Sequence, residues 1–258
     1  MSFALALPAH AKLNLDLRVV GRRADGWHDL ATRFQAISLH DLLLLEQAHQ
    51  TTLAGGFGAA DLVLRAQALL ERAVGRSLPA RFRLAKRIPV RAGLGGGSAD
   101  AAAALRGLIG LHRLDLGAAE VREVAAKVGA DVPFLLQGGA ALATGRGEEL
   151  RPVAPVTGCF ALASPGWGID TAAVYAAWDR VGGEGPNELR RAAETVEPRL
   201  AGFAAGLGPG WLMTGSGTAF FRHCDTRAEA EAAIAGRGCW TAIARPIRAW
   251  AGPEAQPA

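Results

Sequence analysis

Residues 11–20 alternate between apolar and polar side chains. Lys12, Asn14, Asp16 and Arg18 occupy every second position, and leucine or valine fills the positions between them. A period of two is typical of a β-strand that buries one face. Because residues two apart point to the same face, at roughly 3.3 Å per residue, the strand places Lys12 and Asn14 side by side, about 7 Å apart.

Hydrophobic spacing also predicts the remaining elements of the first half. In chain order these are a polar turn over 21–26, a strand through 34–45, a helix over 61–74, a strand over 80–86, a helix from the glycine-rich segment 93–98 to about residue 111, a helix over 118–128 and a short helix through 134–137.

The second half has a different order of elements. The patterns predict a strand near 158–164, helices over 171–181 and 188–205, strands over 211–214 and 218–222, a helix over 226–235 and a strand near 240–248. This β-α-β-β-α-β order with an extra helix is a split βαβ, or ferredoxin-like, layout. The proline- and glycine-rich stretch 151–158 predicts a boundary, so we expect an α+β protein with domains 1–155 and 156–258. Residues 252–258 are predicted to be disordered.

Composition narrows the class of protein. Half of the 258 residues are apolar, which is enough for a sizeable core. No apolar run reaches the roughly 18 residues of a membrane span, and MSFALALPAH lacks the parts of a signal peptide, so we expect a cytoplasmic protein. Three cysteines without a C-x-x-C motif predict buried thiols rather than disulfides or a zinc site. The net charge of +4 is scattered, which favours a small anionic substrate over nucleic acid or a membrane.

The segment GLGGGSAD at 93–100 predicts a phosphate-binding loop. Glycines let successive backbone N–H groups approach an anion, and the helix that follows adds the positive end of its dipole. The loop lacks the Gly-Lys-Ser/Thr of a Walker A motif, and Ser98 stands where a dinucleotide fold has its third glycine. Asp100 likewise replaces the last glycine of a nucleophile elbow. The alternative is a flexible turn before a helix capped by Ser98.

Lysine is rare in this chain. Of 28 basic residues only Lys12, Lys86 and Lys127 are lysines, so a lysine that remains is a candidate for a role that requires a compact point charge. We assign that role to Lys12 and interpret Lys86 and Lys127 as ordinary surface charges.

Four segments together resemble the GHMP small-molecule kinases: PAHAKLNL at 8–15, GLGGGSAD at 93–100, GADVPF at 129–134 and MTGSGTAFF at 213–221. With GRRADGWHDL at 21–30 and PNEL at 186–189, the chain is more similar to the GHMP kinases that act on 4-diphosphocytidyl-2-C-methyl-D-erythritol in the non-mevalonate isoprenoid route. The resemblance implies a ribosomal-protein-S5-like nucleotide domain and a ferredoxin-like second domain, with the active site between them. It further implies transfer of the ATP γ-phosphoryl group to the 2-hydroxyl of that acceptor.

The resemblance also assigns the nucleotide site. ATP is expected to contact the backbone of Pro89, Val90, Arg91, Ala92, Gly93, Leu94, Gly95, Gly96, Gly97, Ser98 and Ala99. A second glycine loop, Gly215, Ser216 and Gly217, is expected to close against the first near the phosphates. The Ser98 hydroxyl is the candidate ligand for Mg²⁺.

Asp131 corresponds to the catalytic aspartate of the family, which accepts or orients the proton of the attacking hydroxyl. Lys12 corresponds to the lysine that stabilises negative charge beside it. The alternative for Asp131 is an ordinary N-cap of the helix through 134–137, and both roles are compatible if that helix begins at the cleft.

The remaining predicted site residues contact the acceptor. Asn14 would face the sugar-alcohol portion, Trp27 and Tyr175 would stack on cytosine, His28 would read its edge, and Thr171 would add a polar contact. Taken alone, Tyr175 also fits a core position of a helix. The chain departs from the usual family pattern at His10, Asp16, Arg18, Trp27 and Arg91.

Three alternative functions fit the sequence less well. A homoserine- or phosphomevalonate-type kinase has no use for Trp27, His28 and Tyr175 as a base site. A non-catalytic nucleotide-binding protein would not require Lys12, Ser98 and Asp131 together. A dehydrogenase is disfavoured because the glycine loop lies far from the N-terminus and Ser98 interrupts the dinucleotide fingerprint. We expect a monomer or weak homodimer.

Overall fold

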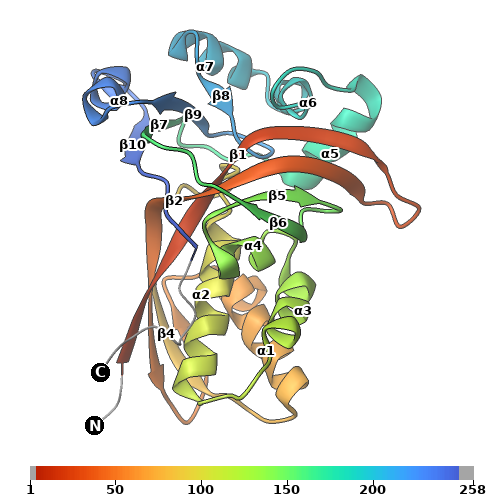
Figure 1. The fold of residues 1–258 in the computed structure, drawn as a ribbon, viewed down its shortest axis with the longest axis vertical. Helices are drawn as coiled ribbons and strands as arrows, with labels where there is room; N and C mark the ends of the chain where they lie inside the picture. Colours follow the sequence, from red (N-terminus) through yellow and green to blue (C-terminus); the bar gives the residue numbers. More distant parts are fainter. Residues whose placement is uncertain (1–3, 250–258) are drawn as a thin grey trace.

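The computed structural model describes residues 4–249, and two sheets with their helices make up this part of the chain (Figure 1). A long antiparallel hairpin of β1 (Ala4–Arg22) and β2 (His28–Gln47) belongs to the first sheet and extends to the second half of the structure. The strand predicted over 11–20 is confirmed, but it begins earlier. The prediction missed this first part because the apolar run before residue 11 does not alternate with polar residues. Irregularities in the pairing follow His10, Asn14 and Val19.

The first sheet is built on this hairpin. β1 pairs with one edge of β2, and the other edge pairs with β4 (Ala80–Ala85) and β5 (Ala140–Thr144), which carry β3 (Thr52–Ala54) and β6 (Glu149–Val153). The sequence did not predict the short strands β3, β5 and β6. β6 contains part of the predicted boundary at 151–158, and the remainder leads to the second sheet.

Helices pack against the first sheet to form the lower half of the molecule in Figure 1. They are η1 (Gly58–Ala60), α1 (Leu62–Val74), α2 (Gly96–Leu111), α3 (Ala118–Val128) and α4 (Val132–Gln137), and the four α-helices lie where the sequence predicts them. α2 is central: four consecutive alanines, 101–104, are fully buried, and only such small side chains let a helix pack closely on all sides.

The second sheet has the predicted order of elements. Its antiparallel strands are arranged β10-β7-β9-β8, and the elements are β7 (Cys159–Ser164), α5 (Thr171–Val181), α6 (Arg190–Val196), α7 (Arg199–Leu207), β8 (Leu212–Met213), β9 (Phe220–Cys224), α8 (Arg227–Ile234) and β10 (Trp240–Ala244). The single helix predicted over 188–205 is wrong. The chain leaves the helix at Glu197 and Pro198 because proline lacks the N–H that a continuous helix requires.

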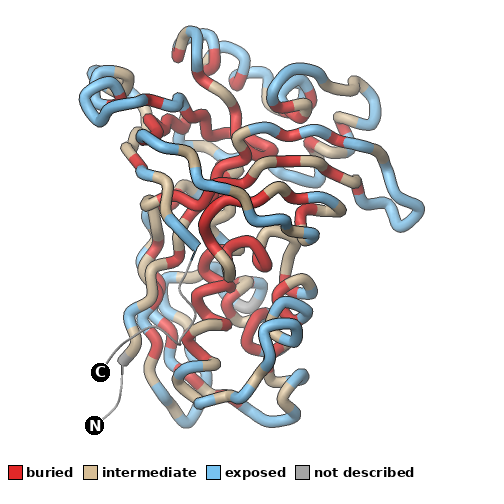
Figure 2. The backbone as a smooth tube through the Cα atoms, viewed as in Figure 1, coloured by how far each residue is buried: buried red, intermediate tan, exposed pale blue. Residues whose placement is uncertain are grey.

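Three buried clusters hold the fold together (Figure 2). One lies under the first sheet, and one lies between the second sheet, its helices and the far part of the hairpin. The third joins them, with Leu13 and Ile37 from the hairpin, Leu94 from the glycine-rich loop, and Phe160 and Phe221 from the second sheet. The glycine-rich loop is therefore fixed by the packing between the halves.

The three cysteines are free thiols, as the sequence predicts; Cys159 and Cys224 are buried, and Cys239 is partly exposed. The chain returns after β10 to the first sheet, where Ser38 N donates to Arg245 O and Ile247 N donates to Ala36 O. The tail predicted to be disordered, 252–258, lies outside the described residues.

Buried Asn187, in the PNEL segment, connects β1 with the second glycine loop. Its amide nitrogen donates to the carbonyls of Met213 (2.8 Å) and Gly215 (2.9 Å), and its oxygen accepts from Leu189 N (3.0 Å). The flanking residues Pro186 and Glu188 bond the backbone of Leu17 in β1.

We expect Asn187→Ala to lower the free energy of unfolding by about 2 kcal/mol or more, because two buried carbonyls lose their donor. Urea unfolding measures this loss. Thr195→Ala, which removes an exposed hydroxyl on α6, is the control and should shift stability by no more than ~0.5 kcal/mol. A loss for Asn187→Ala no larger than that of the control would contradict the assigned role.

Candidate active site

A cavity of about 920 Å³ lies where the two halves meet. Its wall comes from the hairpin β1–β2, the first glycine loop, the start of α4, the helix α5 and the second glycine loop. The predicted site residues that line it are Lys12, Asn14, Trp27, His28, Pro89, Val90, Arg91, Ala92, Gly93, Leu94, Gly95, Gly96, Gly97, Ser98, Asp131, Thr171, Tyr175, Gly215 and Ser216. Ala99 and Gly217 do not line it: Ala99 faces the core from the first turns of α2, and Gly217 packs near Met213.

Lys12 is buried at the base of the cavity, with only 4% of its surface exposed. Its Nζ donates to Asn14 Oδ1 at 2.5 Å, lies 3.4 Å from Asp131 Oδ2 and stands 5.3 Å from the centroid of the Phe34 ring. A buried ammonium group requires such partners. The side-by-side placement of Lys12 and Asn14 is confirmed.

Asn14 is itself held from two sides. Its amide nitrogen donates to Thr32 Oγ1 and its backbone N donates to Thr214 Oγ1, both at 2.8 Å. Thr32 lies on β2 and Thr214 opens the second glycine loop, so this residue ties the hairpin to that loop.

Asp131 stands at the N-cap position of α4, but its side chain makes no capping hydrogen bond. The capping interpretation is therefore wrong for the carboxylate, which reaches Lys12 instead. Pro133 in the first turn lacks an N–H, which leaves fewer backbone donors for a cap to satisfy. The carboxylate is left at the cavity wall, with 29% of the side chain exposed.

The first glycine loop depends on backbone shapes that glycine favours. Gly93 and Gly95 have φ of +80° and +70°, and a Cβ on Gly93 would collide with the carbonyl of Thr214. Gly95, not Ser98, is the N-cap of α2, so the alternative of a Ser98 cap is wrong. Gly96, Gly97 and Ser98 form the first turn of α2 at the cavity, where the N–H groups of a helix have no partner within the helix.

The second glycine loop packs directly on the first. Ala219 N donates to Ala92 O at 2.9 Å, and a Cβ on Gly215 would stand 2.8 Å from Gly93 O. Ser216 shares a hydrogen bond of 2.9 Å with Thr171 at the start of α5. The two loops therefore form one wall, joined to α5.

A cluster of three aromatic side chains, His28, Tyr175 and Trp178, lies elsewhere at the cavity and is called the aromatic group below. His28 is 8% exposed; its ring stacks on Tyr175 (centroids 5.0 Å apart, planes at 24°) and meets Trp178 edge-on at 5.7 Å. His28 Nε2 lies 2.7 Å from Asp179 Oδ1. Burial raises the pKa of the Tyr175 hydroxyl far above its usual range, and the charge of Asp131 raises it further.

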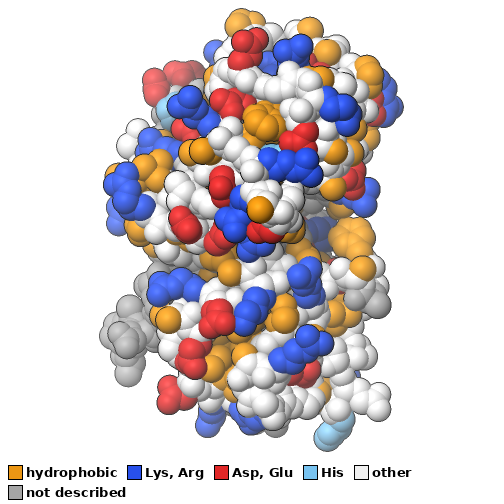
Figure 3. All heavy atoms as spheres, turned by 90° about the vertical axis from the view of Figure 1, so that its right-hand side faces the viewer, with side chains coloured by type: hydrophobic (Ala, Val, Ile, Leu, Met, Phe, Trp, Pro, Cys, Tyr) orange, Lys and Arg blue, Asp and Glu red, His pale blue; other side chains and the backbone are white. Residues whose placement is uncertain are grey.

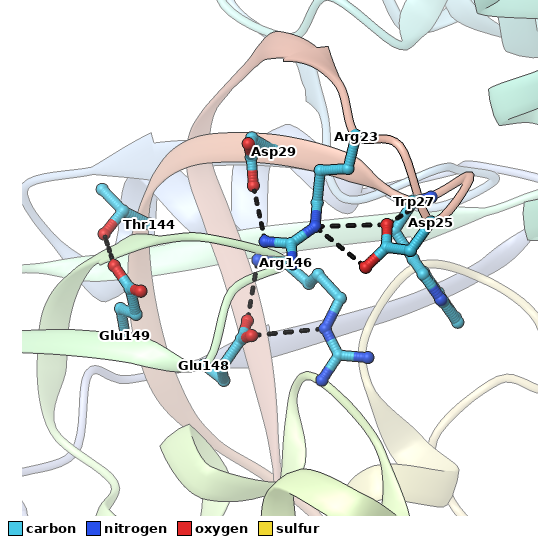
Figure 4. A network of polar contacts seen from close by, with 8 residues as sticks. All are labelled: Arg23, Asp25, Trp27, Asp29, Thr144, Arg146, Glu148 and Glu149. Carbon is cyan, nitrogen blue, oxygen red and sulfur yellow. Dashed lines mark hydrogen bonds and ion pairs between the residues drawn. The ribbon is translucent and has the colours of Figure 1, made fainter.

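Trp27 is 57% exposed at the tip of the hairpin and is held by charged neighbours (Figure 4). The guanidinium of Arg146, from the turn between β5 and β6, stands 5.3 Å from the centroid of its ring, and Trp27 N donates to Asp25. Glu148 in turn fixes Arg146. One face of the indole is therefore covered by a cation.

Sequence reasoning missed a buried charge cluster beside the first loop. Lys86 Nζ bonds Asp41 of β2 and, at 2.7 Å, Asp100 of α2, so its interpretation as an ordinary surface charge is wrong. A Cβ on Gly96 would lie 3.3 Å from the same nitrogen. Lys127, by contrast, is an exposed residue paired with Glu123 one turn earlier on α3, as interpreted.

Ionisation within this cluster departs from ordinary values. Burial raises the pKa of Asp100 to about 7, against the opposing attraction of Lys86. Burial also acts to lower the pKa of Lys86, but its two carboxylate partners outweigh that effect and the net shift is upward. Asp100 Oδ1 is buried without a hydrogen-bond partner among the described residues.

Several further cavity residues carry no sequence signal of their own: Arg22, Phe57, Leu62, Arg146 and Asp179. Only the fold brings them to the wall. The position of Asp179, four residues after Tyr175 on one helix, is the single spacing that could have indicated a shared face.

A magnesium ion fits this wall only if phosphate oxygens supply part of its coordination. No group of three or more His, Cys, Asp or Glu side chains suited to a metal ion occurs within residues 4–249. Magnesium commonly takes one or two protein oxygens together with substrate phosphates and water. The Ser98 hydroxyl and the Asp131 carboxylate are two oxygens on the wall that could serve in this way.

No described helix is both long and apolar enough to cross a membrane. On the face drawn in Figure 3, basic and acidic side chains are intermixed.

Comparison with known proteins identifies relatives along the chain. Residues 61–139 match the model of the GHMP kinases N terminal domain. A 4-diphosphocytidyl-2-C-methyl-D-erythritol kinase of Moorella thermoacetica is 43% identical over 216 residues, which cover 79% of this chain and 75% of that protein. The kinase of the same name from Nocardia farcinica is 38% identical, with 95% and 92% covered.

Solved structures agree with these relatives. A crystal structure of 4-(cytidine 5'-diphospho)-2C-methyl-D-erythritol kinase matches with a TM-score of 0.76 and 35% identity, covering 94% of this chain and all of that one. The mevalonate kinase of Methanococcus jannaschii, at 11% identity, a TM-score of 0.69 and coverage of 96% and 99%, shares the fold.

The raised pKa of Asp100 predicts a pH-dependent stability. Between the ordinary value of 3.8 and about 7, the folded chain keeps a proton on Asp100 that the unfolded chain releases. The free energy of unfolding should therefore fall as pH rises through this window, by at most ~1.4 kcal/mol per pH unit, and this contribution should stay constant above it.

Urea unfolding of the wild type and of Asp100→Asn across the window measures this slope, because asparagine cannot ionise. The free energy of unfolding of the wild type, measured relative to that of Asp100→Asn, should fall as the pH rises through the window. A difference that stays flat would contradict the raised pKa.

Proposed function

This chain belongs to the family of 4-diphosphocytidyl-2-C-methyl-D-erythritol kinases, and we propose that its cavity carries out that reaction with Lys12 and Asp131 at the point of phosphoryl transfer. The chain is an ATP-dependent small-molecule kinase that transfers the γ-phosphoryl group to the 2-hydroxyl of the acceptor. One observation carries the site assignment: a single cavity contains the first glycine loop, the Lys12–Asp131 pair and the aromatic group around His28.

The phosphates of ATP bind to the wall formed by the two glycine loops. The free N–H groups at the start of α2 and the positive end of its dipole stabilise the phosphate charge. Ser98 would supply a hydroxyl for Mg²⁺, and the ion would neutralise negative charge on the phosphates. Because both loops pack on each other, the phosphate wall is formed before ATP arrives.

Transfer takes place at the Lys12–Asp131 pair. Asp131 accepts or orients the proton of the acceptor hydroxyl, and the ammonium of Lys12 stabilises the negative charge that develops on the oxygens around it. Phosphoryl transfer depends mainly on positioning and charge stabilisation, which suits a lysine held on two sides by Asn14 and Asp131.

The acceptor base binds at the aromatic group. Centroids 5.0 Å apart are typical of an offset stack, so His28 overlaps only part of the Tyr175 ring. A cytosine lying edge to edge with His28 covers the rest of that face, and Trp27 closes the other side of the base. Thr171 contributes a polar contact, and Asn14 faces the sugar-alcohol portion.

The finer assignments rest on the same geometry. The strand order β10-β7-β9-β8 supports the ferredoxin-like description of the second half, and the sheet carrying α1 to α4 supports an S5-like nucleotide domain. The hairpin packs against both halves. The proposed domain division at residue 155 therefore divides the sequence, whereas in the folded structure the hairpin is shared by the two halves. Cytoplasmic location and a monomer or weak homodimer stay predictions from the sequence.

The test of function is phosphoryl transfer from ATP to three acceptors: the cytidine diphosphate sugar alcohol, homoserine and mevalonate. We expect kcat/KM for the cytidine acceptor to exceed the others by ~10² or more, because only that acceptor uses the aromatic group. Equal use of an acceptor that lacks a base would overturn the assignment.

Asp131→Asn should reduce turnover by about 10²–10⁴ while ATP binding stays nearly unchanged, because asparagine keeps the shape but cannot take the proton. Asp170→Asn is the matched control: Asp170 caps α5 outside the cavity, and asparagine caps equally well. Steady-state kinetics compares the two, and turnover of Asp131→Asn within a few-fold of the control would remove Asp131 from the chemistry.

A further inference from the structure

The edge of the His28 ring carries two nitrogens in different surroundings. Nε2 lies 2.7 Å from Asp179 Oδ1, whereas Nδ1 has no hydrogen-bond partner within residues 4–249. Tyr175 stacks on one face of the ring, and Trp178 meets the ring nearly at right angles. Nδ1 is therefore the remaining atom through which this ring can bond a ligand in the cavity.

Asp179 is placed to control that edge. It follows Tyr175 by four residues on α5, so both side chains lie on the helix face that meets the hairpin. Its second oxygen lies 3.5 Å from Arg22 at the end of β1. The hydrogen bond from His28 lowers the pKa of Asp179, and an ionised carboxylate can only accept hydrogen bonds.

The proton between them must then sit on the histidine nitrogen. We propose that Asp179 is a positioning residue that fixes the proton of His28 on Nε2, so that Nδ1 acts as a hydrogen-bond acceptor and selects cytosine over uracil. The selectivity part rests on the proposed function, whereas the position of the proton does not.

The chemistry of the two bases explains the selection. Cytosine presents an amino group, a donor, at the position where uracil presents a carbonyl oxygen, an acceptor. An acceptor at Nδ1 can accept a hydrogen bond from the amino group of cytosine, but it faces the lone pairs of the uracil carbonyl oxygen. A buried acceptor left unpaired costs far more than a good hydrogen bond gains, so a site of this kind rejects the wrong base.

The alternative is that Asp179 serves only to hold α5 against the hairpin through Arg22. That role predicts a loss of stability or of all acceptor use in a variant, without any change in the choice between bases. The ratio of kcat/KM for the cytidine acceptor to that for its uridine analogue separates the two roles.

In Asp179→Leu the imidazole is free to move its proton to Nδ1 and donate to uracil. We expect the cytidine-to-uridine ratio to fall about tenfold, the effect of roughly one hydrogen bond, while the KM for ATP stays unchanged. A ratio equal to that of the wild type would overturn the proposal.

A double-variant cycle shows whether Asp179 acts through His28. In a His28→Ala background, Asp179→Leu should have no further effect on the ratio, because the ring that it positions is absent. Additive effects of the two substitutions would overturn the proposal.

Nitrogen NMR reads the proton directly and without any substrate. In chains labelled with ¹⁵N-histidine, the His28 signals, assigned by their loss in His28→Ala, should show the Nε2–H form in the wild type and a mixture of both forms in Asp179→Leu. An Nδ1–H form in the wild type, or identical signals in the variant, would overturn the fixed proton. Failure of the wild type to use the cytidine acceptor would instead overturn the proposed function.

Discussion

The burial of one ammonium group governs the arrangement of this site. A charge that is almost removed from water must be surrounded by oxygens, and Lys12 finds them on Asn14 two residues away and on Asp131 at the start of α4. Asn14 is fixed in turn by Thr32 and Thr214. The requirement of a single cation therefore ties together the hairpin, α4 and the second glycine loop, which otherwise belong to distant parts of the sequence.

The position of the cavity follows from the same connections. The hairpin carries Lys12 along one strand and His28 near its tip, so a single element spans the cavity from the proposed transfer point to the proposed base site. The middle cluster packs Leu94 of the first loop against Phe160 and Phe221 of the second sheet. The proposed phosphate-binding wall, which is built from two loops of opposite halves, can form only at this junction.

The sequence predicted what depends on local spacing. The alternation over 11–20 placed Lys12 beside Asn14 because a period of two is a property of any strand, and the helices of the first half follow their apolar spacing. It failed where distant residues decide. Lys86 looks like a surface charge until Asp41 and Asp100 approach it from β2 and α2. The pairing of Asp131 with Lys12 is confirmed, but it was expected only from the resemblance to the GHMP kinases and not from any local pattern around Asp131. The helix predicted over 188–205 is divided at Pro198. This proline is a local signal for a helix break, but the prediction followed the apolar spacing instead.

In the proposed arrangement, one cavity holds both substrates, with the acceptor hydroxyl at the Lys12–Asp131 pair. A crystal structure with the cytidine acceptor and a non-hydrolysable ATP analogue tests it most directly. We expect the γ-phosphate between the two glycine loops, the 2-hydroxyl within hydrogen-bond distance of the Asp131 carboxylate, and cytosine edge to edge with His28 over Tyr175. Phosphates bound away from the start of α2, or a base bound away from His28, would contradict it.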